Sequence, residues 1–287
     1  MTIQEEHALD TLHQAAGAAA HGAADAHGAE EGVDIVHHLA DSHVMEFPPF
    51  GEIHLPEIHL FGLDLSITKY TVYMWIAAAL LLLILLPMAR RRGGVYHGIY
   101  NAFEALIVYV RDEIVYANIG REDGRPYVPF IATLFFFILF MNLLGLVPYG
   151  GTPTGNLAVT GVLALFSMVV IEISGIVVNG PVRYAKSLVP EGVPLFLAPI
   201  MIPIEIIGHF AKPFALMIRL FANMTAGHVV ILSMLGLIFL LKAWLVVPIS
   251  VGFALFIFLL ELLIAFIQAY IFSVLTAVFI NLSRHPH

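Results

Sequence analysis

Long apolar runs separated by short polar stretches make up most of the chain after residue 69. The runs over 70–89, 127–147 and 157–179 each contain the roughly 20 mostly apolar residues that a transmembrane helix requires. Two further runs, about 199–241 and 248–281, are longer. As straight helices rising about 1.5 Å per residue, they would overshoot a hydrocarbon core of about 30 Å. The pattern predicts an all-α polytopic membrane protein with three spans and a C-terminal hairpin of two long helices, strongly tilted or broken.

The polar stretches between these runs predict an orientation in the membrane. Arg90–Arg92 close the first run, and the positive-inside rule places that end in the cytoplasm and the N-terminus outside. Segment 90–126 is then cytoplasmic. Its centre, 95–116, has apolar residues at helical spacing among charged ones, which indicates an amphipathic interfacial helix. The Gly-, Pro- and Thr-rich residues 148–156 predict an external loop, and the tail 283–287 is expected in the cytoplasm.

Charge sets the N-terminal segment, residues 1–69, apart from the rest. Residues 1–68 hold 12 of the 21 acidic side chains, nine of the 14 histidines and no lysine or arginine. This acidic block argues against a nucleic-acid partner. The segment also lacks the basic and apolar regions of a cleavable signal peptide, and it is too acidic for a transit peptide. We therefore expect a bacterial plasma (inner) membrane protein with an acidic, His-rich and solvated external segment.

Composition gives no support to a metal or thiol site. The chain has no cysteine, and the histidine spacings of the N-terminal segment match no standard metal-binding pattern. We therefore expect no cofactor and no metal. No Gly-rich phosphate loop of the G-x-x-x-x-G-K-[ST] type occurs either, so the chain is not expected to hydrolyse ATP by itself.

Arg219 is unusual because it carries a permanent charge in the middle of an apolar run. A guanidinium near a bilayer centre costs at least about 2.5–3.5 kcal/mol, and charges at that depth usually mark an ion pathway. An arginine that snorkels to the membrane surface is the plainer alternative, and the mid-run position argues against it. Four other polar side chains share its helix face, Glu205, His209, Lys212 and Asn223.

The last two runs also predict a pair of groups at one depth. A helical hairpin with its turn near residues 244–245 places His228 level with Glu261, on the face of its helix opposite Arg219. Gln268 lies two turns beyond Glu261 on the same face. A buried imidazole and carboxylate are able to exchange protons near neutral pH, or they form only a structural interhelical hydrogen bond. The amides of Asn223 and Gln268 either take part in function as polar groups or only join helices by hydrogen bonds.

No acidic side chain of the hairpin lies near Arg219. Glu205 is 14 residues away, roughly 21 Å along an ideal helix, and Glu261 is nine residues off its level, roughly 13 Å. Glu172 on the preceding run is the one internal candidate, and channel lining or pairing with a lysine are its other interpretations. Otherwise we expect the counter-ion to come from a partner subunit that carries a membrane-buried carboxylate.

Two segments of these runs resemble subunit a of the rotary F-type ATP synthase. Residues 216–228, L-M-I-R-L-F-A-N-M-T-A-G-H, follow the family pattern L-x-x-R-L-F-x-N-M-x-A-G-[EH]. Residues 268–276, Q-A-Y-I-F-S-V-L-T, resemble the family segment Q-A-x-[IV]-F-x-x-L-T. The resemblance covers about 69–282 and implies a subunit of the membrane Fo sector, with an ion-translocating core over 127–282. Three shorter segments also fit, 140–148, 202–205 and 212–213.

The resemblance implies roles for the residues that match the family pattern. Arg219 would face the rotating ring of c subunits, draw the proton off each passing carboxylate and block leakage between two offset half-channels. Some members carry the acid at position 228 and the imidazole at position 261, the reverse of this chain. The external half-channel would be lined by Asn223, His228, Glu261 and Gln268, and the cytoplasmic one by Glu205, with Glu172 as a further candidate.

The resemblance also implies partners, and two other functions compete with it. The partners are the c-subunit ring, b-type peripheral stalk subunits, other ATP synthase subunits and the lipid membrane. One competing function is a self-contained secondary transporter that uses Arg219 to bind an anion. Such transporters usually show inverted repeats, and the sequence has none that we can detect. The other is a purely structural membrane anchor.

Overall fold

A computed structural model describes most of the chain after residue 43. The described residues are 44–47, 51–54, 56, 59–60, 63–64, 66–90, 98–147, 150–186, 198–241, 244 and 246–285. They divide into two units, one of residues 229–257 and one of the described residues in 41–228 and 258–287. Every side chain that the sequence singles out for ion translocation belongs to the second unit.

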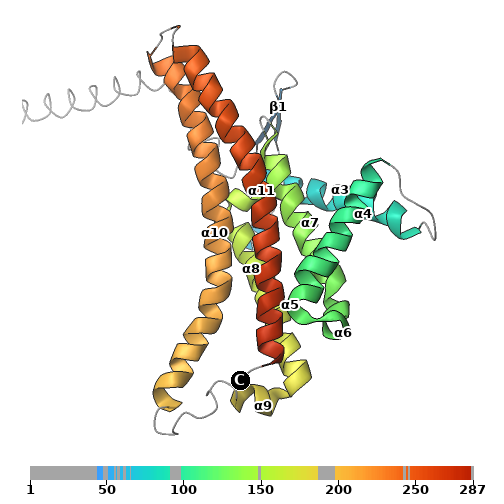
Figure 1. Ribbon diagram of the computed structural model, residues 1–287. Helices are drawn as coiled ribbons and strands as arrows, with labels where there is room; N and C mark the ends of the chain where they lie inside the picture. Colours follow the sequence, from blue (N-terminus) through green and yellow to red (C-terminus); the bar gives the residue numbers. More distant parts are fainter. Residues whose placement is uncertain are drawn as a thin grey trace, which may run out of the picture. The chain divides into compact units, whose positions relative to one another are not determined.

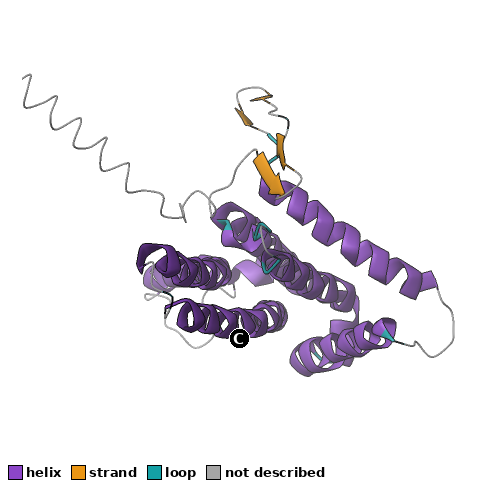
Figure 2. Cartoon of the chain, turned by 90° about the horizontal axis from the view of Figure 1, so that it is seen from above, coloured by secondary structure: helices purple, strands orange, loops and turns teal. Residues whose placement is uncertain are grey.

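The N-terminal segment contains two short antiparallel hairpins, an addition to the all-α expectation. Strands β1 (Val44–Phe47) and β2 (Gly51–His54) pair with Val44 opposite His54, and β3 (His59–Leu60) pairs with β4 (Leu63–Asp64). Valine, isoleucine and phenylalanine favour strands, and the sequence places Pro48 and Pro49 between β1 and β2, where proline favours a turn. Figure 2 shows that strands occur only here among the described residues and that the rest is helical.

Five helices in the described part are long and apolar enough to cross a membrane. This confirms a helical polytopic membrane protein. Two of the helices, α10 and α11, are much longer than one span requires (Figure 1). The five are α3 (Lys69–Arg90), α7 (Val128–Gly145), α8 (Leu157–Asn179), α10 (Ala198–Leu241) and α11 (Val246–Arg284).

Local signals set the ends of α8. Asn156 caps its N-terminus, where the side-chain oxygen accepts a hydrogen bond from the Ala158 amide at 2.8 Å. Gly180 ends the helix with φ +77°, a conformation that suits glycine, and Pro181 begins the short helix α9 (Pro181–Lys186). These cap residues explain why the helix spans the same residues, 157–179, as the apolar run.

Short helical elements lie between α3 and α7. Helix α4 (Ile99–Tyr109) continues as the π-helix η2 (Val110–Tyr116), within the expected amphipathic segment. Val110, Ile114 and Val115 are its buried residues, so η2 packs one face into the core. The remaining elements are α5 (Ala117–Ile119), α6 (Arg121–Gly124) and the 3₁₀ turn η3 (Arg125–Tyr127).

Helix α7 lies at the centre of the core. Half of the residues in its apolar stretch are buried, compared with 6–22% in the other four long helices. Because α7 is enclosed by protein, it is apolar on all sides. Its large buried side chains pack in one cluster with residues of η2, α10 and α11, among them Leu220, Met224, Phe272 and Ile280. Many apolar side chains on α8, α10 and α11 remain exposed, as expected for surfaces that face lipid or partner subunits.

The Gly-, Pro- and Thr-rich stretch that the sequence predicts as an external loop turns inward and is buried by the protein. Gly151–Thr154 are buried, and the 3₁₀ turn η4 (Pro153–Gly155) packs against α7. The Thr154 hydroxyl donates to Asn142 Oδ1 at 2.7 Å, and Asn142 Nδ2 donates to the Ala265 carbonyl at 3.3 Å. Each buried polar group thus has a partner, which lets a polar stretch enter an apolar core.

Candidate functional site

His228 of α10 and Glu261 of α11 form a buried hydrogen-bonded pair. His228 Nδ1 contacts Glu261 Oε1, and the Glu261 side chain is only 1% exposed. This is the contact that the hairpin register predicts. Gly227 makes room for it, since a Cβ there would lie 2.7 Å from Glu261 Oε1. The second carboxylate oxygen, Oε2, has no hydrogen-bond partner among the described residues.

The other ring nitrogen of His228 faces the inward-turned stretch. His228 Nε2 lies 2.6 Å from Thr152 Oγ1 and 3.0 Å from the Gly145 carbonyl oxygen. When Nε2 is bare, it accepts a hydrogen bond from the Thr152 hydroxyl. When Nε2 carries a proton, it donates to the Gly145 carbonyl or to Thr152 Oγ1. The imidazole therefore has a partner in both protonation states, and it can gain or lose a proton at Nε2 while Nδ1 stays bonded to Glu261.

Arg219 lies on another side of α10 and is exposed, whereas its neighbours Leu216 and Leu220 are buried in the core. No hydrogen bond or ion pair joins the guanidinium to any residue of the described chain. The internal counter-ion that the sequence left open, Glu172, has other partners, Tyr184 and His209. Arg219 is thus available to an acidic group from outside the chain.

The two amide side chains predicted to line the external half-channel make fewer contacts than His228 and Glu261. Gln268 is buried and Asn223 is half-buried. Neither side chain makes a hydrogen bond to a described residue, so the interhelical hydrogen bonds offered as their alternative role are not found among these residues.

Lys212 lies over the ring of Phe279, with 5.4 Å from Nζ to the ring centre, a contact between α10 and α11.

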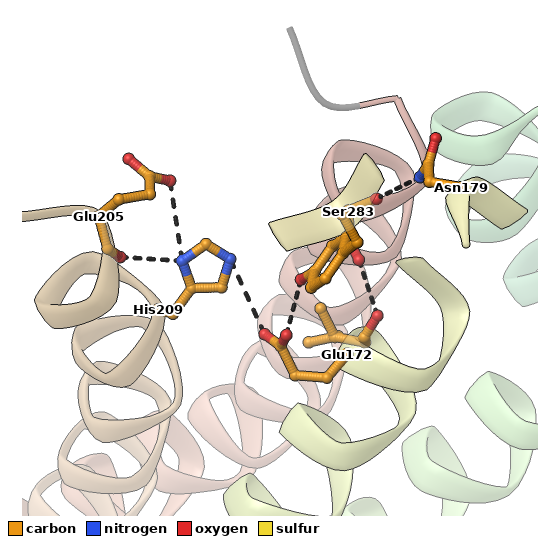
Figure 3. A network of polar contacts seen from close by, with 7 residues as sticks. Glu172, Asn179, Glu205, His209 and Ser283 are labelled. Atoms are coloured by element: carbon orange, nitrogen blue, oxygen red, sulfur yellow. Dashed lines mark hydrogen bonds and ion pairs between the residues drawn. The ribbon is translucent and has the colours of Figure 1, made fainter. Parts of the chain in front are cut away.

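A second imidazole cluster lies further toward the start of α10 (Figure 3). His209 Nδ1 is 3.7 Å from Glu205 Oε1, and His209 Nε2 is 3.8 Å from Glu172 Oε1. The Tyr184 hydroxyl donates to Glu172 Oε2 at 2.6 Å. Only the Glu205–His209 spacing of four residues was visible in the sequence. Nothing in the apolar pattern singled out Tyr184 or Thr152, because both lie outside the long apolar runs.

Residues near the end of α11 make hydrogen bonds and an ion pair with residues of α8 and of the short elements before α7. The Arg284 guanidinium pairs with Asp123 and donates to the Tyr127 hydroxyl at 3.3 Å, and Tyr127 shares a hydrogen bond of 2.5 Å with Ser174. Asn179 Nδ2 donates to the carbonyls of Ser283 and Arg284 at 3.2 and 3.0 Å. These contacts hold α8 against α11 and so keep the carboxylate of Glu172 in place.

Known proteins match nearly the whole membrane part of this chain. A family model described as "ATP synthase A chain" matches residues 71–281. "ATP synthase subunit a" of Chloroherpeton thalassium is 48% identical over 258 residues, 88% of this chain and 77% of the relative. "ATP synthase subunit a 2" of Prosthecochloris aestuarii is 47% identical over 272 residues, 92% of this chain and 83% of the relative. "ATP synthase subunit a" of Myxococcus xanthus is 53% identical over 228 residues, 77% of this chain and 74% of the relative. Because the family model and these relatives cover most of the sequence, the chain belongs to the ATP synthase subunit a family.

Proposed function

We propose that this chain is the proton-translocating stator subunit of the Fo sector, with two offset half-channels and with Arg219 facing the c-ring. Membership of the family makes it a non-catalytic, membrane-embedded component of ATP synthase. The observation that carries the proposal is the arrangement on α10. A buried His228–Glu261 pair faces inward, and an exposed Arg219, which has no partner among the described residues, lies nine residues away.

The proposed path runs from the outside to the cytoplasm. Protons enter past Gln268, Glu261 and His228 and load a c-ring carboxylate. After a rotation they leave on the side of Glu205. Each charge that falls through 100 mV releases about 2.3 kcal/mol. This energy becomes torque only if Arg219 prevents direct passage between the half-channels.

We propose the matching topology for the same reason. The N-terminus lies outside, α4 and η2 lie at the cytoplasmic interface, and the C-terminus is cytoplasmic. Helices α10 and α11 lie tilted along the c-ring, which accounts for their 44 and 39 residues. The b-type stalk subunits hold the chain against rotation.

Neutralising both charged elements of the path tests the proposal. We expect the double variant Arg219→Ala/Glu261→Gln to lose ATP-driven acidification of vesicles that contain the reconstituted complex. The control is complex assembly, measured by co-purification of the other subunits. A structural anchor requires unchanged proton flux in this variant, and that result would overturn the proposal. Purification tests the alternative of a self-contained transporter. Such a transporter would isolate without a ring of small hydrophobic subunits, so co-purification of a ring would exclude it.

Thr152→Val tests the hydrogen bond that the inward-turned stretch makes to His228. Valine keeps the shape of threonine but removes the hydroxyl, and the lost hydrogen bond costs about 1 kcal/mol. We expect the rate of ATP-driven proton pumping to fall several-fold, because unprotonated Nε2 loses its donor. Thr152→Ser keeps the hydroxyl and is expected to pump like the parent chain. Equal rates in the two variants would show that the bond plays no part in translocation.

A further inference from the structure

His209 lies between two carboxylates that come from different helices. Its Nδ1 is 3.7 Å from Glu205 Oε1 on α10, and its Nε2 is 3.8 Å from Glu172 Oε1 on α8 (Figure 3). Nδ1 also lies 2.9 Å from the Glu205 carbonyl oxygen, which accepts a hydrogen bond when Nδ1 carries the proton. Each ring nitrogen therefore faces its own proton donor or acceptor, the arrangement that a proton relay through an imidazole requires.

This cluster differs from the His228–Glu261 pair in the exposure of its carboxylates. Glu172 and Glu205 are 26% and 39% exposed at the protein surface, whereas Glu261 is 1% exposed; the two imidazoles are similar, at 22% for His209 and 17% for His228. The separations of 3.7 and 3.8 Å are ion-pair distances, longer than a hydrogen bond, so proton transfer requires a small movement of the side chains. The exposed carboxylates of this cluster suit the open end of a proton path, whereas the buried carboxylate of Glu261 suits a section enclosed by protein.

Tyr184 orients one of these carboxylates. It stands on α9, outside the long apolar helices, and its hydroxyl donates to Glu172 Oε2 at 2.6 Å. Burial, together with the hydrogen bond to Glu172, raises the pKa of Tyr184 to about 12. The phenol therefore keeps its proton under all assay conditions. It occupies Oε2 and leaves Oε1 of Glu172 turned toward His209.

We propose that Glu205, His209 and Glu172 form a proton relay at the cytoplasmic half-channel, and that Tyr184 is a positioning residue for Glu172. This rests on the proposed function of the chain. A proton on the Glu205 carboxyl passes to His209 Nδ1, and the proton on Nε2 passes to Glu172 Oε1, which releases it to water. One proton enters and one leaves. The ring ends in the other tautomer, and proton exchange with water at the open end of the half-channel resets it.

Single cysteines test whether the relay is reached by water. The chain has no cysteine of its own, so a thiol introduced at position 172 or 209 is unique within this subunit. The probe is a membrane-impermeant, positively charged thiol reagent, applied to complexes whose other subunits have no accessible thiol. Ile173→Cys is the matched control, since Ile173 follows Glu172 on α8 and its apolar side chain is 54% exposed. We expect Glu172→Cys and His209→Cys to react at least about tenfold faster than Ile173→Cys, because a thiolate forms only where water reaches it.

Pumping rates test whether the relay carries protons. We expect Glu172→Gln to slow ATP-driven proton pumping about tenfold or more, and Glu172→Asp to restore part of the rate, because a carboxylate is retained. Tyr184→Phe is expected to slow pumping several-fold in the parent chain and to have no further effect in the Glu172→Gln variant. A purely structural tyrosine would slow both backgrounds equally.

Arg219→Ala, measured in the same vesicles, separates the two levels of the proposal. If Arg219→Ala abolishes pumping while Glu172→Gln pumps normally and neither thiol reacts, the relay is wrong and the proposed function stands. If Arg219→Ala pumps normally, the proposed function is wrong and the relay has no role in it. Loss of pumping in both variants, together with reactive thiols at positions 172 and 209, supports the relay.

Discussion

Arg219→Ala is expected to abolish ATP-driven proton pumping while the complex assembles normally. The guanidinium is exposed and makes no hydrogen bond or ion pair within the described chain, so its removal leaves no buried group unpaired and is not expected to destabilise the fold. In the proposed function, the variant loses the interaction of Arg219 with the c-ring carboxylate and the barrier between the half-channels. The measurement is ATP-driven fluorescence quenching of a pH dye in reconstituted vesicles.

Passive proton flow gives a second measurement for the same variant. Once the catalytic sector is stripped away, vesicles with Arg219→Ala are expected to leak protons faster than vesicles with the parent subunit, since the charge that blocks direct passage is gone. Arg183→Ala is the matched control, because Arg183 is an exposed arginine on the short helix α9, outside the long apolar helices. Normal pumping by Arg219→Ala would contradict the assignment of Arg219.

Glu261→Gln is expected to reduce the pumping rate about 100-fold, within the range of roughly 10² to 10⁴ for the loss of a positioned acid or base. Glutamine has nearly the same shape and still bonds to His228 Nδ1, so the packing around Gly227 is preserved. What disappears is the capacity of position 261 to take up and release a proton. The rate is measured in the same vesicle assay, with the amount of assembled complex as control. A rate equal to that of the parent chain would place the pair off the proton path.

Exchange of the two residues separates proton chemistry from geometry. The double variant His228→Glu/Glu261→His retains one acid and one imidazole at the same level and is expected to regain part of the rate lost in Glu261→Gln. Recovery is expected to be partial because the Gly145 carbonyl, 3.0 Å from His228 Nε2, only accepts hydrogen bonds and would repel a carboxylate at position 228. Recovery to the parent rate would show that the partners of Nε2 do not matter.

Much of the fold was predictable because the signals are local. An apolar run of the right length, with Asn156 before it and Gly180-Pro181 after it, predicts a helix whatever the rest of the chain does. The two long helices follow from the same reasoning, and their common turn sets the register that brings His228 level with Glu261. The absence of an acid near Arg219 in its own hairpin was visible from spacing alone.

The parts that could not be predicted depend on contacts between distant segments. Residues 150–156 have the composition of an exposed loop, yet Thr152 is buried because His228 and Asn142 lie where its stretch can supply hydrogen-bond partners. Tyr184 lies on a six-residue helix with no distinctive pattern, and only the packing of α9 against α8 brings its hydroxyl to Glu172. His209 has a visible neighbour at Glu205, but its second carboxylate comes from another helix.

The sequence by itself determined the class, the helices, the family motifs and the unusual charge at Arg219, because hydropathy, capping and spacing along one helix are properties of contiguous residues. Only the tertiary structure decided which buried polar groups have hydrogen-bond partners and which residues supply them. It gave His228 a second partner in Thr152, assigned Glu172 to His209 and Tyr184, and left Arg219 without a partner in the described chain. Such pairings arise because a buried polar group is costly unless a group on another segment pairs with it, and a linear pattern does not encode which segments meet.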